Sequence, residues 1–162
     1  PTKLKVLGID PGSRVTGYGV VEKQRNGLIA IQQGEIRLTG SSLLSSFMLT
    51  LYNQLLALLD EQQPDAVAIE DIFYGKNVKS LIKQAHVRGV AILAGSMRHI
   101  PVFEYSPLEI KQAVVGYGRA EKSQVQKMVA AILHLAQIPP ADAADALAVA
   151  ICHINFLKVK SI

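Results

Sequence analysis

The feature that most constrains the fold is a set of three β-type segments within the first 38 residues. The segments Leu4–Asp10, Thr16–Lys23 and Leu28–Leu38 are rich in β-branched residues. Short turn sequences separate them, a Pro-Gly pair at 11–12 and an Asn-Gly pair at 26–27. Because tight turns of this kind reverse the chain, the sequence predicts three consecutive antiparallel strands.

The rest of the chain alternates between helical and strand patterns. Apolar residues recur at helical spacing from Leu43 to Leu59, and Pro64 then ends the helix. The apolar run Ala66–Ile69 is typical of a parallel strand that is buried on both faces. Further patterns predict a short strand at 101–104 and helices at 77–97, 107–115, 121–135 and 142–156. The chain is therefore predicted to be an α/β domain with a mixed five-stranded sheet flanked by helices.

Composition supports one folded domain, which we place at residues 1–156, followed by a short basic tail at 157–162. Of the 162 residues, 49% are hydrophobic and 19% are charged, which excludes a disordered chain. Cys152 is the only cysteine, so no disulfide can form within the chain, and a reducing, cytoplasmic location fits best. Serines and threonines interrupt the uncharged stretch Leu38–Leu59, so we expect no membrane span. The first residues, Pro-Thr-Lys, lead directly into a strand, so we expect no signal peptide. The net charge of +4 weakly favours a polyanionic partner.

Carboxylates stand at the ends of two predicted strands and at the start of one predicted helix. Asp10 closes the first strand, and Glu70 and Asp71 close the fourth. Because side chains alternate along a strand, only one of Glu70 and Asp71 can face Asp10, and the spacing does not say which. Asp142 and Asp145 share one face of an alanine-rich helix that can pack closely against a neighbour. Since sites assemble at strand ends in α/β sheets, we expect these acids to meet.

Each of these acids also has an ordinary structural explanation. Asp142 could cap its helix, and Asp145 could complete a capping box. Glu70 and Asp71 could begin a solvated loop, and an aspartate before Pro-Gly, such as Asp10, is a common turn residue. Acids at the ends of two apolar strands and at the start of an alanine-rich helix together favour a shared site.

A shared site of four carboxylates would need a cation or a proton, because the negative charges would otherwise repel one another strongly. Oxygen ligands favour Mg²⁺ or Mn²⁺. The histidines at 86, 99, 134 and 153 show no zinc-site spacing. Two divalent ions about 3.5–4 Å apart would activate a water and stabilise the leaving oxygen of a phosphodiester. The predicted chemistry is phosphodiester hydrolysis.

Four longer segments carry a family resemblance: GIDPGSRVTGYGV, AIEDIF followed by YGKN, PVFEYSP leading into KQAVVGYGRAEKSQVQ, and ADAADALAVAICH. In this order they resemble the RuvC family of bacterial Holliday-junction resolvases. The resemblance implies a ribonuclease-H-like fold with four catalytic metal ligands, Asp10, Glu70, Asp142 and Asp145, and so favours Glu70 over Asp71. It implies an endonuclease of DNA recombination and repair that cuts two strands of like polarity in a four-way junction. It also implies two Mg²⁺ ions per site, for which Mn²⁺ can substitute, a homodimer, and a RuvA–RuvB branch-migration partner.

Basic residues near the predicted site are candidates for DNA binding. They lie along the helix after the Glu70 strand and around a Gly-Tyr-Gly loop at 116–118: Lys76, Lys79, Lys83, Arg88 and Arg98, and Lys111, Arg119 and Lys122. The loop could open a helix whose free N–H groups hold a phosphate, or it could be a plain turn and cap. The resemblance favours Lys111 and Lys122 as residues near the scissile phosphate.

Two further features of the same region are open to more than one interpretation. Phe73 and Tyr74 could stack on unpaired bases or pack in the core, and the resemblance implies stacking for Phe73. Small residues on the helix 77–97, including Ala85 and Gly89, could pack within the chain or against a second copy. A twofold dimer would cut two strands symmetrically, and the resemblance implies one.

Two other functions compete with junction cleavage. GIDPGS could be a phosphate loop of the actin and sugar-kinase type, although a chain of 162 residues supplies one of the two domains that such enzymes need. The chain could also be a basic junction-binding module whose acids only cap helices. Cleavage of a synthetic junction with and without Mg²⁺ separates the three hypotheses.

Overall fold

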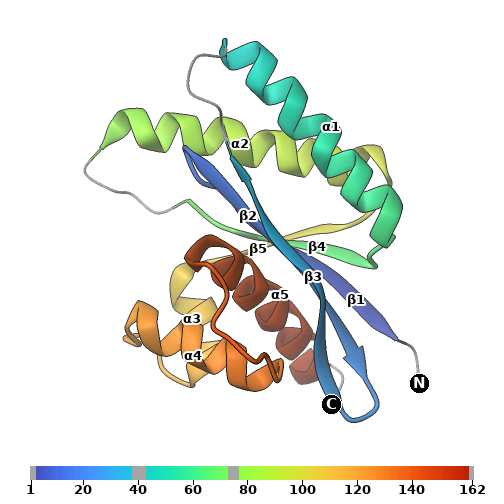
Figure 1. The fold of residues 1–162 in the computed structure, drawn as a ribbon, viewed down its shortest axis with the longest axis vertical. Helices are drawn as coiled ribbons and strands as arrows, with labels where there is room; N and C mark the ends of the chain where they lie inside the picture. The colour runs from blue at the N-terminus through green and yellow to red at the C-terminus, as the bar shows by residue number, and fades with distance from the viewer. Residues whose placement is uncertain (1–2, 38–42, 73–76, 161–162) are drawn as a thin grey trace.

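A computed structural model describes residues 3–37, 43–72 and 77–160, which form one sheet and five helices (Figure 1). In chain order the elements are β1 (Leu4–Asp10), β2 (Val15–Gln24), β3 (Gly27–Arg37), α1 (Leu44–Gln62), β4 (Ala66–Glu70), α2 (Val78–Met97), β5 (Val102–Tyr105), α3 (Pro107–Val115), α4 (Lys122–Ile132) and α5 (Ala141–Lys160). The strand order is β3-β2-β1-β4-β5. β1, β2 and β3 are antiparallel, whereas β4 runs parallel to β1 and β5 parallel to β4. The predicted mixed five-stranded sheet flanked by helices is confirmed.

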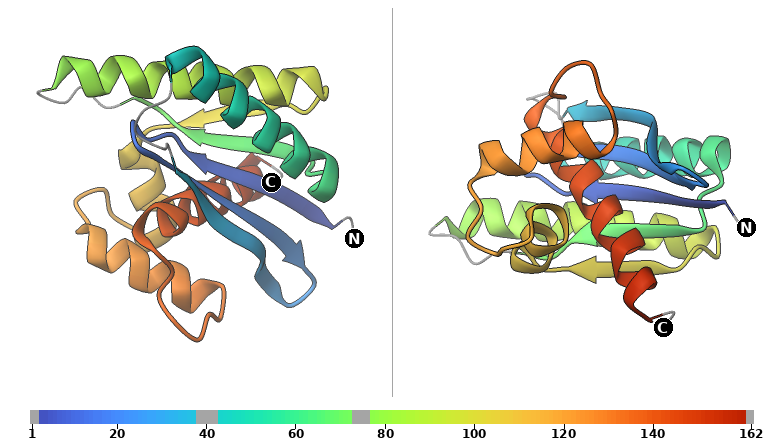
Figure 2. Two further views of the ribbon diagram at one scale, coloured as in Figure 1. Left: turned by 45° about the horizontal axis from the view of Figure 1, so that its top comes forward. Right: turned by 90° about the horizontal axis from the view of Figure 1, so that it is seen from below.

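Helices cover both faces of this sheet (Figures 1 and 2). α1 and α2 lie on one face, and α3, α4 and α5 lie on the other. Side chains alternate along β1, so that Val6 joins the buried cluster on the α5 side and Leu7 joins the cluster on the α1–α2 side. β4 contributes Ala68 and Ile69 to the two clusters in the same way. The centre of the sheet is therefore buried on both faces, as the apolar run of β4 predicts.

The uncharged stretch that begins at Leu38 forms the amphipathic helix α1 from Leu44 onward. Leu51, Leu55 and Leu58 are buried, while polar residues such as Gln54 are exposed. Among the described helices, none combines the length and the apolar character needed to cross a lipid bilayer.

α5 lies directly against β1 because small residues line both surfaces. Ala143, Ala146 and Ala150 of α5 are fully buried. On β1, a Cβ atom at Gly8 would overlap the carbonyl oxygen of Ala146 and lie 3.0 Å from the backbone nitrogen of Ala150. The helix backbone thus rests on the strand backbone with no side chain between them.

The boundaries of two helices differ from the predicted ones. α4 ends at Ile132, and the chain turns away at His134, which has a left-handed φ of 53°. α5 begins one residue early, because the carbonyl of Pro140 already accepts a hydrogen bond of 2.8 Å from the N–H of Ala144. Asp142 therefore lies inside the first turn and is not the N-cap, so the capping-box explanation does not apply. At its other end α5 continues to Lys160, since no glycine or proline interrupts it after 156.

We predict that Gly8→Ala destabilises the fold by about 1–3 kcal/mol, because α5 must move away from β1 to admit the methyl group. Gly89→Ala is the matched control, since an added Cβ at this exposed position of α2 meets no described atom within 4 Å. Chemical denaturation measures both free energies of unfolding. Equal stability of the two variants would contradict the close packing of α5 on β1.

Candidate active site

Three carboxylates from distant parts of the chain meet at the carboxyl-terminal end of β1. Asp10 is the last residue of β1, and Asp142 and Asp145 lie in the first two turns of α5. One oxygen from each carboxylate lies within 4.8 Å of an oxygen of each of the others. All three residues are partly buried. The predicted meeting of a strand end with the start of the alanine-rich helix is therefore present in the fold.

Glu70 joins this group from the neighbouring strand. β4 runs parallel to β1, so the carboxyl ends of the two strands lie side by side. The charge of Glu70 helps to raise the pKa of Asp10, so the two carboxyl groups lie close enough to affect each other's protonation. Asp71 lies on the other face of the sheet, where its Oδ1 is 3.3 Å from Nη2 of Arg88 on α2. Strand alternation thus places Glu70, and not Asp71, beside Asp10.

Gly17 on β2 determines how closely the start of α5 approaches Asp10. Gly17 is the residue paired with Asp10 in the β1–β2 ladder. A Cβ atom at Gly17 would overlap the carbonyl group of Asp142. Because glycine has no side chain, the first turn of α5 can lie against β2 and bring Asp142 next to Asp10.

The clustered acids change one another's protonation. Burial is the largest cause that raises the pKa of Asp10 to about 8, and repulsion by the three other carboxylates adds to it. Burial also raises the pKa values of Glu70 and Asp145, although Lys122 partly offsets the shift at Asp145. Without a cation Asp10 therefore holds a proton at neutral pH. A divalent ion would relieve this repulsion, and the oxygen-only donor set fits Mg²⁺ or Mn²⁺.

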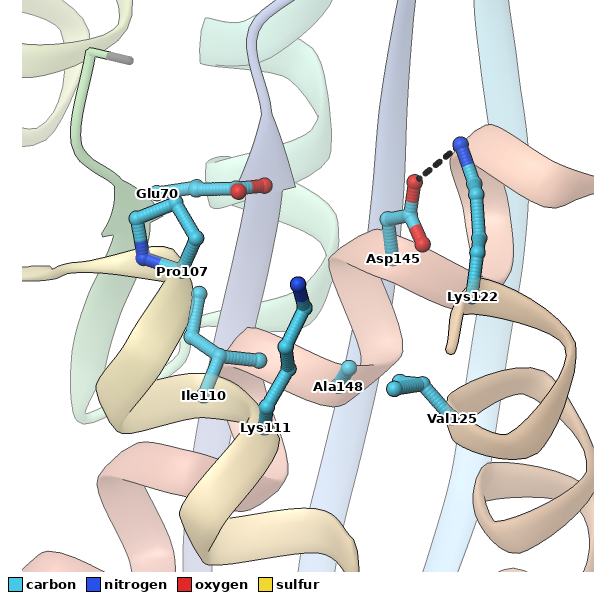
Figure 3. Close-up of a pocket in the computed structure, with 8 residues that line it drawn as sticks. All are labelled: Glu70, Pro107, Ile110, Lys111, Lys122, Val125, Asp145 and Ala148. Carbon is cyan, nitrogen blue, oxygen red and sulfur yellow. Dashed lines mark ion pairs between the residues drawn. The ribbon is translucent and has the colours of Figure 1, made fainter. Parts of the chain in front are cut away.

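A cavity of about 360 Å³ opens beside the acids (Figure 3). In Figure 3 the side chain of Lys111 points toward the space between Glu70 and Asp145. Nζ of Lys122 lies 3.2 Å from Oδ2 of Asp145, and this carboxylate raises the pKa of Lys122. Four apolar and four charged residues line the cavity: Pro107, Ile110, Val125 and Ala148, and Glu70, Lys111, Lys122 and Asp145.

The Gly-Tyr-Gly loop at 116–118 ends α3 and does not open α4. Gly116 has a left-handed φ of 100°, and its N–H donates to the carbonyl of Gln112. α4 begins later, at Lys122, after the N–H of Glu121 has bonded Oε1 of Gln124 at 2.9 Å. The turn-and-cap interpretation therefore describes Gly116, and the expectation that the loop itself opens a helix is wrong.

The other candidates for DNA binding have different environments. Lys79 and Lys83 are exposed near the start of α2, and Arg119 is exposed in the loop before α4. Two arginines are engaged in ion pairs: Arg98, the C-cap residue of α2, with Asp60, and Arg88 of α2 with Asp71, which follows β4, and with Glu104 of β5. The prediction that Arg88 belongs to an exposed basic surface is wrong, because its side chain is only 14% exposed. Three further candidates lie outside the described residues: Phe73, Tyr74 and Lys76.

Comparison with known proteins gives the family. Residues 6–153 match the model for crossover junction endodeoxyribonuclease RuvC. The chain belongs to the RuvC family. A RuvC from Ruminiclostridium cellulolyticum is 52% identical over 151 residues, which cover 93% of this chain and 91% of that protein. A RuvC from Syntrophomonas wolfei is 50% identical over 159 residues, covering 98% and 92%.

Solved structures agree with this membership. Thermus thermophilus RuvC in complex with Holliday junction substrate has a TM-score of 0.92 and 30% identity to this chain, and the match covers 98% of this chain and 97% of that one. The predicted ribonuclease-H-like fold is confirmed. As a member of the RuvC family the chain is a nuclease, which removes the sugar-kinase and pure binding-module alternatives.

One buried contact near the acids of this RuvC chain was not predicted. Tyr105, at the end of β5, and His153, on α5, form a buried hydrogen bond of 2.6 Å between the hydroxyl group and Nδ1. The ring of Phe103 also packs on His153, with 4.4 Å between ring centroids. Burial raises the pKa of Tyr105 to about 12 and lowers the pKa of His153. The sequence signal for this contact was weak. Tyr105 and His153 lie in two of the motifs that carry the family resemblance, but a motif does not indicate that two of its residues form a hydrogen bond.

The raised pKa of Asp10 predicts a stability that depends on pH. Its folded-state pKa of about 8 lies above the ordinary value of 3.8, so the folded chain binds the proton more tightly than the unfolded chain does. The free energy of unfolding should therefore fall as pH rises from about 4 to about 8. In EDTA at about pH 8, Asp10→Asn should raise Tm by at least about 2 °C, which corresponds to roughly 1 kcal/mol in a chain of this size.

The matched control is Asp60→Asn, because Arg98 lowers the pKa of Asp60 and loss of that carboxylate should not stabilise the fold. Adding Mg²⁺ should raise Tm of the wild type more than that of Asp10→Asn. A lower Tm for Asp10→Asn than for the wild type, in EDTA at the same pH, would show that repulsion between the carboxylates does not destabilise the fold.

Proposed function

We propose that this chain is a divalent-metal-dependent endonuclease that resolves Holliday junctions by cutting two strands of like polarity. The observation that carries the proposal is the convergence of Asp10, Glu70, Asp142 and Asp145 at one end of the sheet in a RuvC family member. The solved complex of T. thermophilus RuvC with its Holliday junction substrate supports the choice of DNA. Recombination and DNA repair are the processes in which such junctions need to be resolved.

The four acids would hold two Mg²⁺ ions, and Mn²⁺ would substitute for Mg²⁺. Bound divalent ions supply Lewis-acid activation of water and neutralise charge on the phosphodiester. Because Asp10 holds a proton at neutral pH when no cation is present, ion binding should release a proton, and activity should rise with pH as Asp10 ionises. The carboxylates therefore set both the place of cutting and its pH dependence.

Two lysines make the acidic site accessible to a polyanion. Lys111 and Lys122 come from α3 and α4 and line the same cavity as Glu70 and Asp145. Their ammonium groups offset the negative charge of the acids, so that a phosphodiester can approach and be oriented there. Lys79, Lys83 and Arg119 would bind phosphates farther from the cut. The roles of Phe73 in base stacking and of Lys76 in phosphate binding rest on the family resemblance.

A homodimer would supply two such sites for the two cuts. A stripe along α2 supports this proposal, since it exposes apolar side chains on both sides of the small residue Gly89: Val78, Ile82, Leu93 and Met97. An isologous contact through this stripe would relate the sites by a twofold axis. Sedimentation of the wild type and of Gly89→Leu would detect the dimer and its disruption. A RuvA–RuvB partner stays a prediction from the resemblance.

A synthetic four-way junction labelled on one strand at a time is the direct test of the proposal. With Mg²⁺ the wild type should nick two opposite strands of like polarity, and with EDTA it should bind without cutting. Asp145→Asn should bind the junction and not cut it, because an amide cannot replace the charge that holds the metal. Asp60→Asn is the matched control and should cut normally, since Asp60 is an exposed residue at the end of α1. Cutting in EDTA at the normal rate would contradict the proposal.

A pair of lysine variants separates catalysis from binding. Lys122→Ala should lower the cleavage rate of a saturated junction by roughly 100-fold, the usual effect of losing a charge contact at the reacting phosphate. Lys79→Ala should mainly weaken binding and reduce the log-log salt slope by about one unit. If Lys122→Ala cuts a saturated junction at the wild-type rate, Lys122 has no catalytic role.

A further inference from the structure

Arg88 makes an ion-pair network on the face of the sheet opposite the catalytic acids. It lies in the middle of α2, and its side chain is 14% exposed. Its Nη2 atom is 3.3 Å from Oδ1 of Asp71, which directly follows β4, and it also contacts Oε1 of Glu104 on β5. The same nitrogen atom of Arg88 therefore faces both an acid that follows β4 and an acid of β5, and it interacts with them as an ion pair without a regular hydrogen bond.

Asp71 and Glu104 lie on the same face of the sheet and share this cation, although Glu104 is paired with Ile69, two residues before Asp71. Their side chains are about half exposed, at 51% for Asp71 and 47% for Glu104. Among the described residues, Arg88 is the only cation within ion-pair distance of either carboxylate. Without it the two negative charges would repel each other across the gap between β4 and β5.

The strand ends have few other contacts to resist that repulsion. β5 is an edge strand of four residues. After the last register pair, Glu70 with Tyr105, one backbone hydrogen bond of 2.8 Å continues the ladder, from the N–H of Asp71 to the carbonyl of Tyr105. Tyr105 is held from the opposite face by its hydrogen bond to His153 of α5. On the α2 face, the ion pairs of Arg88 have the corresponding position.

This strand end is also where Glu70 emerges toward the other acids. Glu70 and Asp71 are consecutive, so a displacement of Asp71 moves the backbone that carries Glu70. Glu70 belongs to the cluster through the parallel pairing of β4 with β1, and it lines the same cavity as Asp145. Arg88 itself lies across the sheet from the cavity and does not line it.

We propose that Arg88 is a positioning residue that fixes Glu70 for metal binding by tying together the ends of β4 and β5. This inference rests on the proposed metal-dependent nuclease activity, and it acts through Asp71 and Glu104. Residues that orient metal ligands commonly change metal affinity or turnover by about 10-fold to 100-fold when they are replaced.

Binding of Mn²⁺ without DNA is the decisive measurement, because positioning and long-range electrostatics predict opposite signs. Removing a positive charge should by itself strengthen binding of a cation. If Arg88 positions Glu70, Arg88→Met should instead weaken Mn²⁺ binding by about 10-fold and lower kcat on a saturated junction by a similar factor. The junction Kd in EDTA should not change, since Arg88 is directed at the sheet.

Two further variants keep the test independent of simple unfolding. Removing all three charges, as Arg88→Met with Asp71→Asn and Glu104→Gln, should restore most of the Mn²⁺ affinity and turnover, because no repulsion remains. Arg88→Lys should give a smaller loss than Arg88→Met, since it keeps a positive charge, and a single nitrogen atom of Arg88 faces both carboxylates. Arg98→Met is the matched control: it breaks the ion pair with Asp60, at the end of α1, and should leave both readouts unchanged.

Several results would overturn the inference. They are wild-type or tighter Mn²⁺ binding by folded Arg88→Met, failure of the triple variant to recover, or an equal loss in Arg98→Met. A wild type that binds Mn²⁺ and cuts no junction would contradict the proposed function, while the comparison of Mn²⁺ affinities would still decide the role of Arg88.

Discussion

The site depends on a backbone-to-backbone contact between α5 and the strands β1 and β2. Gly8 admits the carbonyl of Ala146, and Gly17 admits the carbonyl of Asp142. Since Gly17 is paired with Asp10, the contact that seats the helix also sets the distance between Asp142 and Asp10. Asp145 follows one turn later on the same helix, and the parallel pairing of β4 with β1 brings in Glu70. Packing and the proposed catalytic site therefore share one interface.

That interface gathers negative charge, which works against folding. The pKa of Asp10, raised to about 8, expresses the cost of holding ionised carboxylates together in a partly buried place. The buried alanines of α5 and the apolar clusters on both faces of the sheet stabilise the fold against this repulsion. Arg88 and Lys122 place compensating charge on opposite sides of the strand ends. A cation bound among the acids would turn the repulsion into attraction, so the same charges that weaken the metal-free fold prepare it for metal binding.

Much of the fold and the set of acids could be predicted from the sequence, because both follow from local patterns. Alternating and helical periodicities gave the strand and helix order, and acids at strand ends marked the edge where they meet. The choice between Glu70 and Asp71 could not be made from spacing, since it depends on which face of β4 turns toward α5. Arg88 was assigned to an exposed basic surface for a related reason: helical periodicity places a charge on a face but does not say that two acids on other strands will meet it. The contacts of Gly8 and Gly17 are also absent from any local pattern, because they involve a helix more than 120 residues away in the chain.

Anomalous diffraction from crystals grown with Mn²⁺ tests the central claim most directly, because it locates the ion without relying on activity. The account predicts an anomalous peak at the end of β1, within coordination distance of oxygens from Asp10 and from at least one of Asp142 and Asp145, with Glu70 on its other side. No peak among these carboxylates, at a Mn²⁺ concentration that supports cleavage, would contradict the account.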